Sequence, residues 1–236
     1  MNIFYTQNIK GNQAILDETD SFHCSRVLRM KIGDSLNLID GKGGFYEGII
    51  LESKGAIIVD IHKSEQNYGK KNYYLHVAIA PTKNIDRFEW FLEKATEIGI
   101  DEITPLLCQR SERKNLREER LEKILISAIK QSVKAYLPKL NHLTDFNKYI
   151  TNSSEGSRFI AYCETNERQE LIKVKNLENK INILIGPEGD FSPEEIKFAV
   201  KNNFLPVSFG GSRLRTETAG IVACQIISDW KSLQEI

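Results

Sequence analysis

The sequence has 236 residues, 41% apolar and 27% charged, and 32 Lys and Arg side chains balance 32 Asp and Glu side chains. This composition excludes a disordered chain, and the zero formal net charge argues against a protein that coats nucleic acid non-specifically. Four widely spaced cysteines and four histidines show no metal-ligand spacing, and such cysteines fit a reducing compartment. Since the N-terminus has no signal-peptide pattern and no apolar run approaches the ~18 residues of a membrane helix, we expect a cytoplasmic protein.

The first region, residues 1–70, is predicted to be a small β-rich module. Short segments with apolar alternation, separated by glycine-containing turns, predict strands at 2–7, 35–40, 45–53 and 56–64. A short helix is predicted from Asp20 to Met30, with Asp20 as its cap and Phe22, Val27 and Met30 on its inward face. The polar run 64–72 is the expected linker.

The second region, residues 71–236, alternates strand and helix patterns. Strands are predicted at 73–81, 102–108, 158–163, 181–186 and 205–210. Between and after them, helices are predicted at 84–98, 116–137, 192–202 and 216–233. Gly99 follows the first of these helices as its C-cap, and Pro138 ends the second. Strands separated by helices indicate βα units and a mostly parallel sheet.

A glycine-rich loop follows the strand at 181–186. After it, Ser192 and Glu195 form a capping box with Pro193 at the first helical position. The loop itself, residues 186–189, lies at the carboxyl end of a parallel strand, where open α/β sheets bind ligands. Glu188 makes this loop less attractive to phosphate and more attractive to a cation. Taken alone, a tight structural connection also explains it.

A second glycine loop follows the strand at 205–210 and leads through two arginines, Arg213 and Arg215, into the last helix. If both strands belong to one sheet, the two loops face one crevice. Arg215 and Glu217 could simply pair with each other at the helix start. The repetition of a glycine loop beside arginines and hydroxyls favours a site.

Two basic segments are candidates for phosphate contacts. Residues 108–139 carry nine Lys and Arg against four Glu, a localised positive surface. A solvated amphipathic helix would explain most of these charges, but not Arg110 and Arg113, which precede it. In the first region, Arg26 and Arg29 share a predicted helix face with His23, although a solvent-facing basic turn is an equal alternative.

Together these motifs resemble the RsmE family, ribosomal RNA methyltransferases of the SPOUT superfamily that modify a uridine at N3 in small-subunit RNA. The resemblance covers nearly the whole chain. It is carried, in chain order, by His23 with Val27-Leu28-Arg29, Lys83 with Arg87, Lys94-Ala95-Thr96-Glu97-Ile98-Gly99, Arg110-Ser111, Gln131-Ser132, Pro138, Gly186-Pro187-Glu188-Gly189, and Leu214-Arg215-Thr216-Glu217-Thr218-Ala219.

The chain departs from the family pattern at three positions. Asp190 stands where the family usually has a second Gly, Phe209 where Leu is common, and Lys134 where Arg is usual. Lys134 keeps the charge but loses the bidentate geometry of a guanidinium, which puts a specific RNA contact in doubt.

The resemblance implies a two-domain α/β protein. Residues 1–70 would form a PUA-like RNA-binding β-barrel. Residues 71–236 would form a SPOUT methyltransferase domain with a mostly parallel sheet, whose C-terminus threads a trefoil knot and whose active site lies at a homodimer interface. Sequence patterns do not show a knot, and general topology rules argue against one.

The resemblance also implies methyl transfer from S-adenosylmethionine to N3 of a specific uridine, with small-subunit ribosomal RNA or the 30S subunit as partner and neither a membrane nor a metal. Arg215 is expected to stabilise the developing negative charge and Glu217 to accept the proton, although pairing in the knot is the alternative for Glu217. The expected cofactor-binding residues are Gly186, Pro187, Glu188, Gly189, Phe209, Gly210, Leu214, Thr218 and Ala219. The expected RNA-binding residues are His23, Arg26, Arg29, Lys83, Arg87, Lys94, Arg110, Arg113 and Lys134.

Three other functions stay open from the sequence. A SPOUT 2′-O-ribose methyltransferase would activate a hydroxyl and would not need to recognise an N3–H. A non-catalytic RNA-binding assembly factor would keep the fold without using the cofactor. A nucleotide-binding α/β enzyme would have no affinity for RNA.

Overall fold

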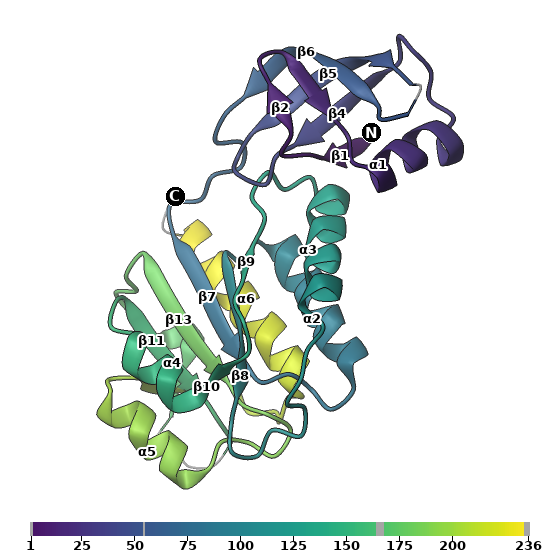
Figure 1. The fold of residues 1–236 in the computed structure, drawn as a ribbon. Coiled ribbons are helices and arrows are strands. Elements are labelled where there is room, and N and C mark those ends of the chain that lie inside the picture. Colours follow the sequence, from purple (N-terminus) through teal and green to yellow (C-terminus); the bar gives the residue numbers. More distant parts are fainter. Residues whose placement is uncertain (1, 54, 164–167, 234–236) are drawn as a thin grey trace. The chain divides into compact units, whose positions relative to one another are not determined.

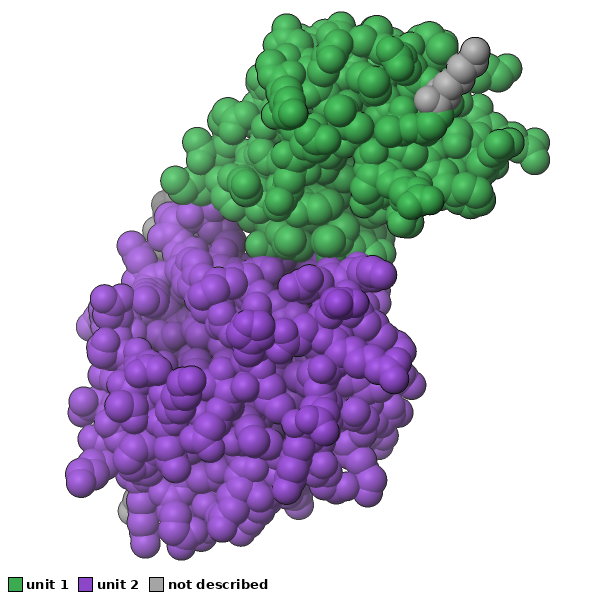
Figure 2. All heavy atoms as spheres, in the orientation of Figure 1, with its two compact units in different colours: residues 1–70, 126–137 green, residues 71–125, 138–236 purple. Residues whose placement is uncertain are grey.

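The computed structural model describes residues 2–53, 55–163 and 168–233 (Figure 1). Two compact units are distinguished in Figure 2. Unit 1 contains residues 1–70 together with 126–137, and unit 2 contains residues 71–125 together with 138–236. The segment 126–137, which the sequence pattern placed in the second region, therefore packs with the first.

Unit 1 is built on a curled six-stranded sheet in the order β1-β4-β5-β6-β3-β2 (Figure 1). Only the β1–β4 pair is parallel. Its apolar core includes Phe4, Leu16, Leu38 and Val59. The strands are β1 (Ile3–Tyr5), β2 (Ile9–Lys10), β3 (Gln13–Ile15), β4 (Ser35–Ile39), β5 (Phe45–Glu52) and β6 (Ile58–Glu65).

The predicted helix of unit 1 is wrong in its cap and in two of its three inward residues, since only Met30 packs against the core. It consists of α1 (Glu18–Phe22) followed by a π-helical turn, η1 (His23–Val27), and its N-cap is Asp17. Asp20 is instead buried and paired with Lys130 Nζ at 2.7 Å. Phe22 and Val27 are 61% and 59% exposed. A π turn breaks the 3.6-residue period on which the predicted inward face depended.

Unit 2 is built on a sheet in the order β10-β8-β7-β13-β11-β14-β12, with β9 paired to β8. Every pairing in it is parallel, so the predicted parallel sheet is confirmed. The strands are β7 (Tyr74–Ile79), β8 (Glu102–Leu107), β9 (Lys139–Leu140), β10 (Thr144–Asp145), β11 (Ser157–Ala161), β12 (Gln169–Glu170), β13 (Lys180–Ile185) and β14 (Leu205–Ser208).

Helices cover both faces of this sheet (Figure 1). On one face α6 packs so closely on α2 that a Cβ at Gly220 would lie 2.6 Å from the Phe91 ring. On the other face α4 and α5 enclose a core that includes Leu184, Phe191 and Phe204. The helices are α2 (Ile85–Ile98), α3 (Glu118–Ser132), α4 (Phe146–Asn152), α5 (Pro193–Lys201) and α6 (Thr216–Leu233), with a 3₁₀ turn η2 at Leu171–Lys173.

The predictions of α2, α5 and α6 are confirmed, the first two together with their capping signals. Asn84 caps α2, and Gly99 ends it in a left-handed conformation with φ 113°. The capping box at Ser192 begins α5 as predicted. The helix expected over 116–137 is shorter, because Val133 adopts φ 57° and the Lys134 N–H donates to the Ile129 carbonyl, which closes a Schellman-type end. A β-branched residue is among the least expected in that conformation, so the sequence carried no stop signal there.

The short elements β2, β3, β9, β10, β12 and α4 were not predicted. Most are two- or three-residue strands, which carry no periodicity to detect. Among the described residues, no helix is long and apolar enough to cross a membrane.

A buried histidine is expected to make the stability of unit 2 sensitive to acid. His76 Nε2 lies 2.7 Å from Thr104 Oγ1, and burial lowers the pKa of His76 to about 4. Because the unfolded chain binds this proton near pH 6.5, stability should fall as the pH drops from 6.5 through 4, by about 2 kcal/mol between pH 6.5 and 4.5. Urea unfolding at both pH values measures this loss. The control is His76→Asn, which should lack the part of the acid-induced loss of stability that comes from His76. If the pH dependence of unfolding were unchanged in that variant, His76 would not be its cause.

Candidate active site

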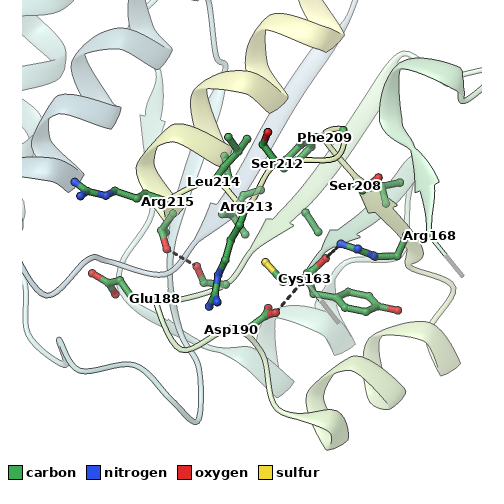
Figure 3. Close-up of a pocket in the computed structure, with 18 of the residues that line it drawn as sticks. Cys163, Arg168, Glu188, Asp190, Ser208, Phe209, Ser212, Arg213, Leu214 and Arg215 are labelled. Atoms are coloured by element: carbon green, nitrogen blue, oxygen red, sulfur yellow. Dashed lines mark hydrogen bonds between the residues drawn. The ribbon is translucent and has the colours of Figure 1, made fainter. Parts of the chain in front are cut away.

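A cavity of about 300 Å³ opens at the carboxyl ends of three neighbouring strands, β13, β11 and β14 (Figure 3). Parallel strands end at one edge, so the loops that follow them meet there. The lining residues are Ala161, Tyr162, Cys163, Arg168, Ile185, Gly186, Pro187, Glu188, Asp190, Val207, Ser208, Phe209, Gly210, Ser212, Arg213, Leu214, Arg215, Thr216 and Ala219.

The loop after β13 is held by several hydrogen bonds. The Thr216 hydroxyl donates to the Gly186 carbonyl at 3.0 Å. The Lys83 N–H donates to Glu188 Oε1 at 2.9 Å, and Arg110 Nη1 donates to the Gly189 carbonyl at 2.8 Å. Loops that are fixed in this way hold their backbone groups in place before a ligand arrives, which reduces the entropy cost of binding.

Asp190 joins two walls of the cavity. Its backbone is left-handed, with φ 62°, a conformation that Gly adopts freely and Asp tolerates. Its carboxylate accepts from the Cys163 N–H at 2.7 Å (Figure 3) and from the Phe191 N–H at 2.8 Å. The loop after β13 is thereby tied to the end of β11.

A second cavity, of about 640 Å³, shares the segment Arg213-Leu214-Arg215 with the first. Its other lining residues come from the exposed side of α2 and from the first turn of α6: Asp86, Arg87, Trp90, Glu217 and Thr218. The two cavities therefore meet at residues 213–215.

Glu217 is buried beside this junction with one carboxylate oxygen unsatisfied. Its side chain is 8% exposed, and its Oε1 lies 3.9 Å from Arg87 Nε. Within the described part of the chain, Oε2 has no hydrogen-bond partner. A buried polar atom without a partner is uncommon in native proteins, and a ligand that donates a hydrogen bond would satisfy it.

Arg215 and Arg213 are exposed, and neither side chain forms a hydrogen bond or ion pair with any residue that the structure describes. In Figure 3 the two side chains point in different directions, with Arg213 extending toward Asp190. Both guanidinium groups have all their donors available for a ligand.

Known proteins share this architecture. Residues 69–228 match the family model described as RNA methyltransferase domain, and residues 16–61 match the model described as RNA methyltransferase PUA domain. The chain is 30% identical to "Ribosomal RNA small subunit methyltransferase E 1" of Borreliella burgdorferi, with 88% of this chain and 89% of that protein covered.

Two solved structures support the same relationship. One is a Porphyromonas gingivalis protein described as a probable rRNA-methyltransferase, with a TM-score of 0.92, 39% identity and coverage of 99% of this chain and 100% of that chain. The other is a Legionella pneumophila protein in complex with bound SAM, with a TM-score of 0.88, 26% identity and 97% of both chains covered.

This chain belongs to the ribosomal RNA small subunit methyltransferase E family. The family predicted from the motifs is confirmed, and so is the combination of a PUA-like module with a SPOUT-type methyltransferase domain. The trefoil knot and the homodimer stay predictions.

Of the nine cofactor-binding residues expected from the family resemblance, seven line the first cavity. Gly189 lies against Arg110, with its carbonyl bonded to that guanidinium, and Thr218 lines the second cavity instead. The sequence analysis missed the wall formed by the end of β11. The strand itself was predicted, but its place between β13 and β14 is a matter of strand order, which periodicity does not reveal.

The structure divides the expected RNA-binding residues between the two units. His23, Arg26, Arg29 and Lys134 lie in unit 1, and Lys83, Arg87, Lys94, Arg110 and Arg113 lie in unit 2.

Several of those in unit 2 have protein partners. Lys94 pairs with Glu93 and Glu97, each at 2.8 Å, and Lys83 pairs with Glu112 at 2.8 Å. Arg113 donates to the carbonyls of Thr82 at 3.0 Å and Lys83 at 2.6 Å. Arg110 and Arg113 thus hold loop carbonyls of the protein itself, at Gly189 and at Thr82 and Lys83.

Proposed function

We propose that this chain transfers a methyl group from S-adenosylmethionine to N3 of a uridine in small-subunit ribosomal RNA. The observation that carries the proposal is the buried Glu217 carboxylate, whose Oε2 has no partner among the described residues, in a cavity that Arg215 also lines and that adjoins the first cavity. A base and a cation are what removal of an imide proton requires. The family membership supplies the reaction class.

The first cavity fits S-adenosylmethionine. Its volume lies in the range of small-molecule sites, and it combines apolar side chains, Ile185, Val207 and Leu214, with exposed loop backbone. The acidic residues Glu188 and Asp190 line the cavity and suit a cationic ligand. When bound, S-adenosylmethionine supplies a methyl group whose bond to the sulfonium sulfur breaks as its bond to N3 forms, with the electron pair staying on sulfur.

In the second cavity, Glu217 and Arg215 carry the proton chemistry. Glu217 accepts the N3 proton, which leaves the ring nitrogen with a free electron pair. Arg215 donates to a ring carbonyl and stabilises the negative charge that spreads onto it. The proton on Glu217 then passes to solvent. Because N3 lies on the Watson–Crick edge, the target uridine must be unpaired or turned out of the stack.

Unit 1 supplies RNA contacts in this proposal. His23, Arg26 and Arg29 are exposed on and next to the π-helical turn. The substrate is the RNA of the small subunit, free or assembled, which puts the reaction in the cytoplasm. A homodimer, with one copy completing the site of the other, is part of the same proposal, and light scattering of the purified protein tests it.

The double replacement of Arg26 and Arg29 by Ala should weaken RNA binding uniformly across sequences. Each lost phosphate contact should reduce the slope of log K against log salt by about 0.7 to 0.9. Binding titrations over a salt series measure that slope. Lys63→Ala, which removes a paired surface lysine of the same unit, is the matched control and should leave the slope unchanged. An equal effect of both changes would mean that the turn is an ordinary solvated surface.

Asp190→Gly should weaken S-adenosylmethionine binding about tenfold. Gly keeps the left-handed backbone but removes the two hydrogen bonds that tie the cavity walls, and a net loss of roughly 1–2 kcal/mol is expected. Isothermal titration calorimetry measures the affinity. Asp190→Asn keeps one acceptor oxygen in the side chain and should therefore retain more of the affinity for S-adenosylmethionine. Wild-type affinity in the Gly variant would show that the two hydrogen bonds of Asp190 do not contribute to cofactor binding.

The reaction is tested with small ribosomal subunits that lack the modification. The protein is incubated with these subunits and S-adenosylmethionine, and the digested RNA is analysed by nucleoside mass spectrometry. N3-methyluridine is the expected product. A 2′-O-methylated nucleoside would replace the proposal by ribose methylation, and RNA binding without cofactor binding would favour an assembly factor.

A further inference from the structure

The exposed side of α2 carries an aromatic surface that packing does not explain. Phe88 and Phe91 are fully buried against the rest of unit 2, whereas Trp90 is 43% exposed. Trp90 lies three and four residues after Arg87 and Asp86, so the three side chains share one helix face. All three line the second cavity.

The same cavity is also lined by charged side chains that form hydrogen bonds in one direction only. The oxygens of the Glu217 carboxylate are hydrogen-bond acceptors, and its Oε2 is buried without a partner in the described structure. Arg87, Arg213 and Arg215 can only donate. The cavity therefore combines the planar Trp90 ring with one acceptor group, the Glu217 carboxylate, and several guanidinium donors.

We propose that the second cavity receives the target nucleobase, with Trp90 as the stacking surface and Glu217 as the group that selects uracil over cytosine. The inference rests on the proposed function for its choice of RNA, but the pocket can be tested without any methyl transfer.

The selection follows from the edges of the two bases. Uracil presents an N3–H donor between two carbonyl acceptors, which complements an acceptor flanked by donors. Cytosine presents an acceptor at N3 and an amino donor at C4, so its N3 would face the Glu217 carboxylate and its amino group would face a guanidinium. A binding site that leaves such groups unpaired rejects the wrong ligand strongly.

The charge of the cavity also favours a nucleotide. Three guanidinium groups and two carboxylates line the cavity, so one net positive charge is left for a phosphate. Stacking on an aromatic side chain accounts for much of the binding of unpaired bases to proteins. The first cavity, where the methyl donor would lie, adjoins the second through residues 213–215.

Tryptophan fluorescence tests the pocket directly, because the chain has only two tryptophans, Trp90 and Trp230. The variant Trp230→Phe leaves Trp90 as the sole tryptophan. It is titrated, with S-adenosylhomocysteine present to prevent turnover, with a short oligoribonucleotide that has one uridine among adenosines, and separately with its cytidine counterpart. We expect the uridine oligonucleotide to quench the emission and to bind about tenfold more tightly than the cytidine one.

Two further variants separate stacking from selection. Trp90→Ala should raise KM for RNA about tenfold with unchanged affinity for S-adenosylhomocysteine, and Trp90→Phe should restore most of the loss. Glu217→Gln, whose amide can also donate, should bring the uridine and cytidine affinities close together. This selectivity is measured by binding and does not depend on methyl transfer. If ribosomal subunits were not methylated but the selectivity were observed, only the proposed reaction would be wrong.

The inference fails if RNA does not quench Trp90 fluorescence. It also fails if the wild-type protein, like Glu217→Gln, binds the uridine and cytidine oligonucleotides with the same affinity. It also fails if the emission responds to protein dilution rather than to RNA, because Trp90 would then be covered by a second copy of the chain. If RNA did not quench Trp90 but ribosomal subunits were still methylated, the proposed reaction would stand, and the placement of the base in the second cavity would be wrong.

Discussion

Replacement of Arg215 by Ala is expected to lower kcat for methyl transfer by roughly 10²–10³-fold and to leave the unfolding temperature unchanged. Loss of one preorganised donor to a developing negative charge has an effect of this size. The fold should not respond, because the Arg215 side chain is exposed and forms no hydrogen bond or ion pair with any described residue. Single-turnover kinetics with saturating RNA, together with thermal unfolding, measure the two effects.

Arg213→Ala is the matched control for this prediction. Arg213 is also exposed and unpaired in the described structure, and it lines the same two cavities. Its side chain extends toward Asp190 rather than along the direction of Arg215, so it should affect cofactor affinity more than kcat (Figure 3). Equal losses of kcat in both variants would mean that the cavity needs positive charge in general and not a donor at residue 215.

General rules of α/β sheets located much of the first cavity from the sequence. The loops at 186–189 and 209–219 each follow a predicted parallel strand, and strands of this kind end at one edge. Seven of the cofactor residues that the family resemblance implied line this cavity. The wall from β11 was missed because it depends on the strand order β13-β11-β14, and pairing partners are set by tertiary packing that no local pattern records.

The basic residues illustrate a different limit. Counting charges predicted a positive surface over 108–139, but it could not show that Arg110 and Arg113 donate to loop carbonyls. Their backbone acceptors are distant in sequence and invisible in a charge count. Similarly, Trp90 sits in a helix whose apolar periodicity was recognised, yet only the fold shows that it points away from the core and lines a cavity.

Replacement of Glu217 by Gln should separate catalysis from stability. The amide is nearly isosteric but cannot accept a proton, so kcat should fall roughly 10²–10⁴-fold. The free energy of unfolding should stay the same or rise, because a buried carboxylate oxygen without a partner is costly and an amide removes that charge.

The experiment compares kcat, cofactor affinity and urea unfolding in wild type and Glu217→Gln, with Arg87→Ala as a control for the 3.9 Å contact between the two side chains. If Glu217 is the base, its variant keeps cofactor affinity and stability and loses turnover. If its role is only to pair within the fold, Glu217→Gln and Arg87→Ala should both unfold more easily, and turnover per folded molecule should be retained. A proton acceptor predicts that kcat falls while stability is kept, whereas a structural ion pair predicts that stability falls while turnover per folded molecule is kept. One set of measurements therefore decides between the two roles.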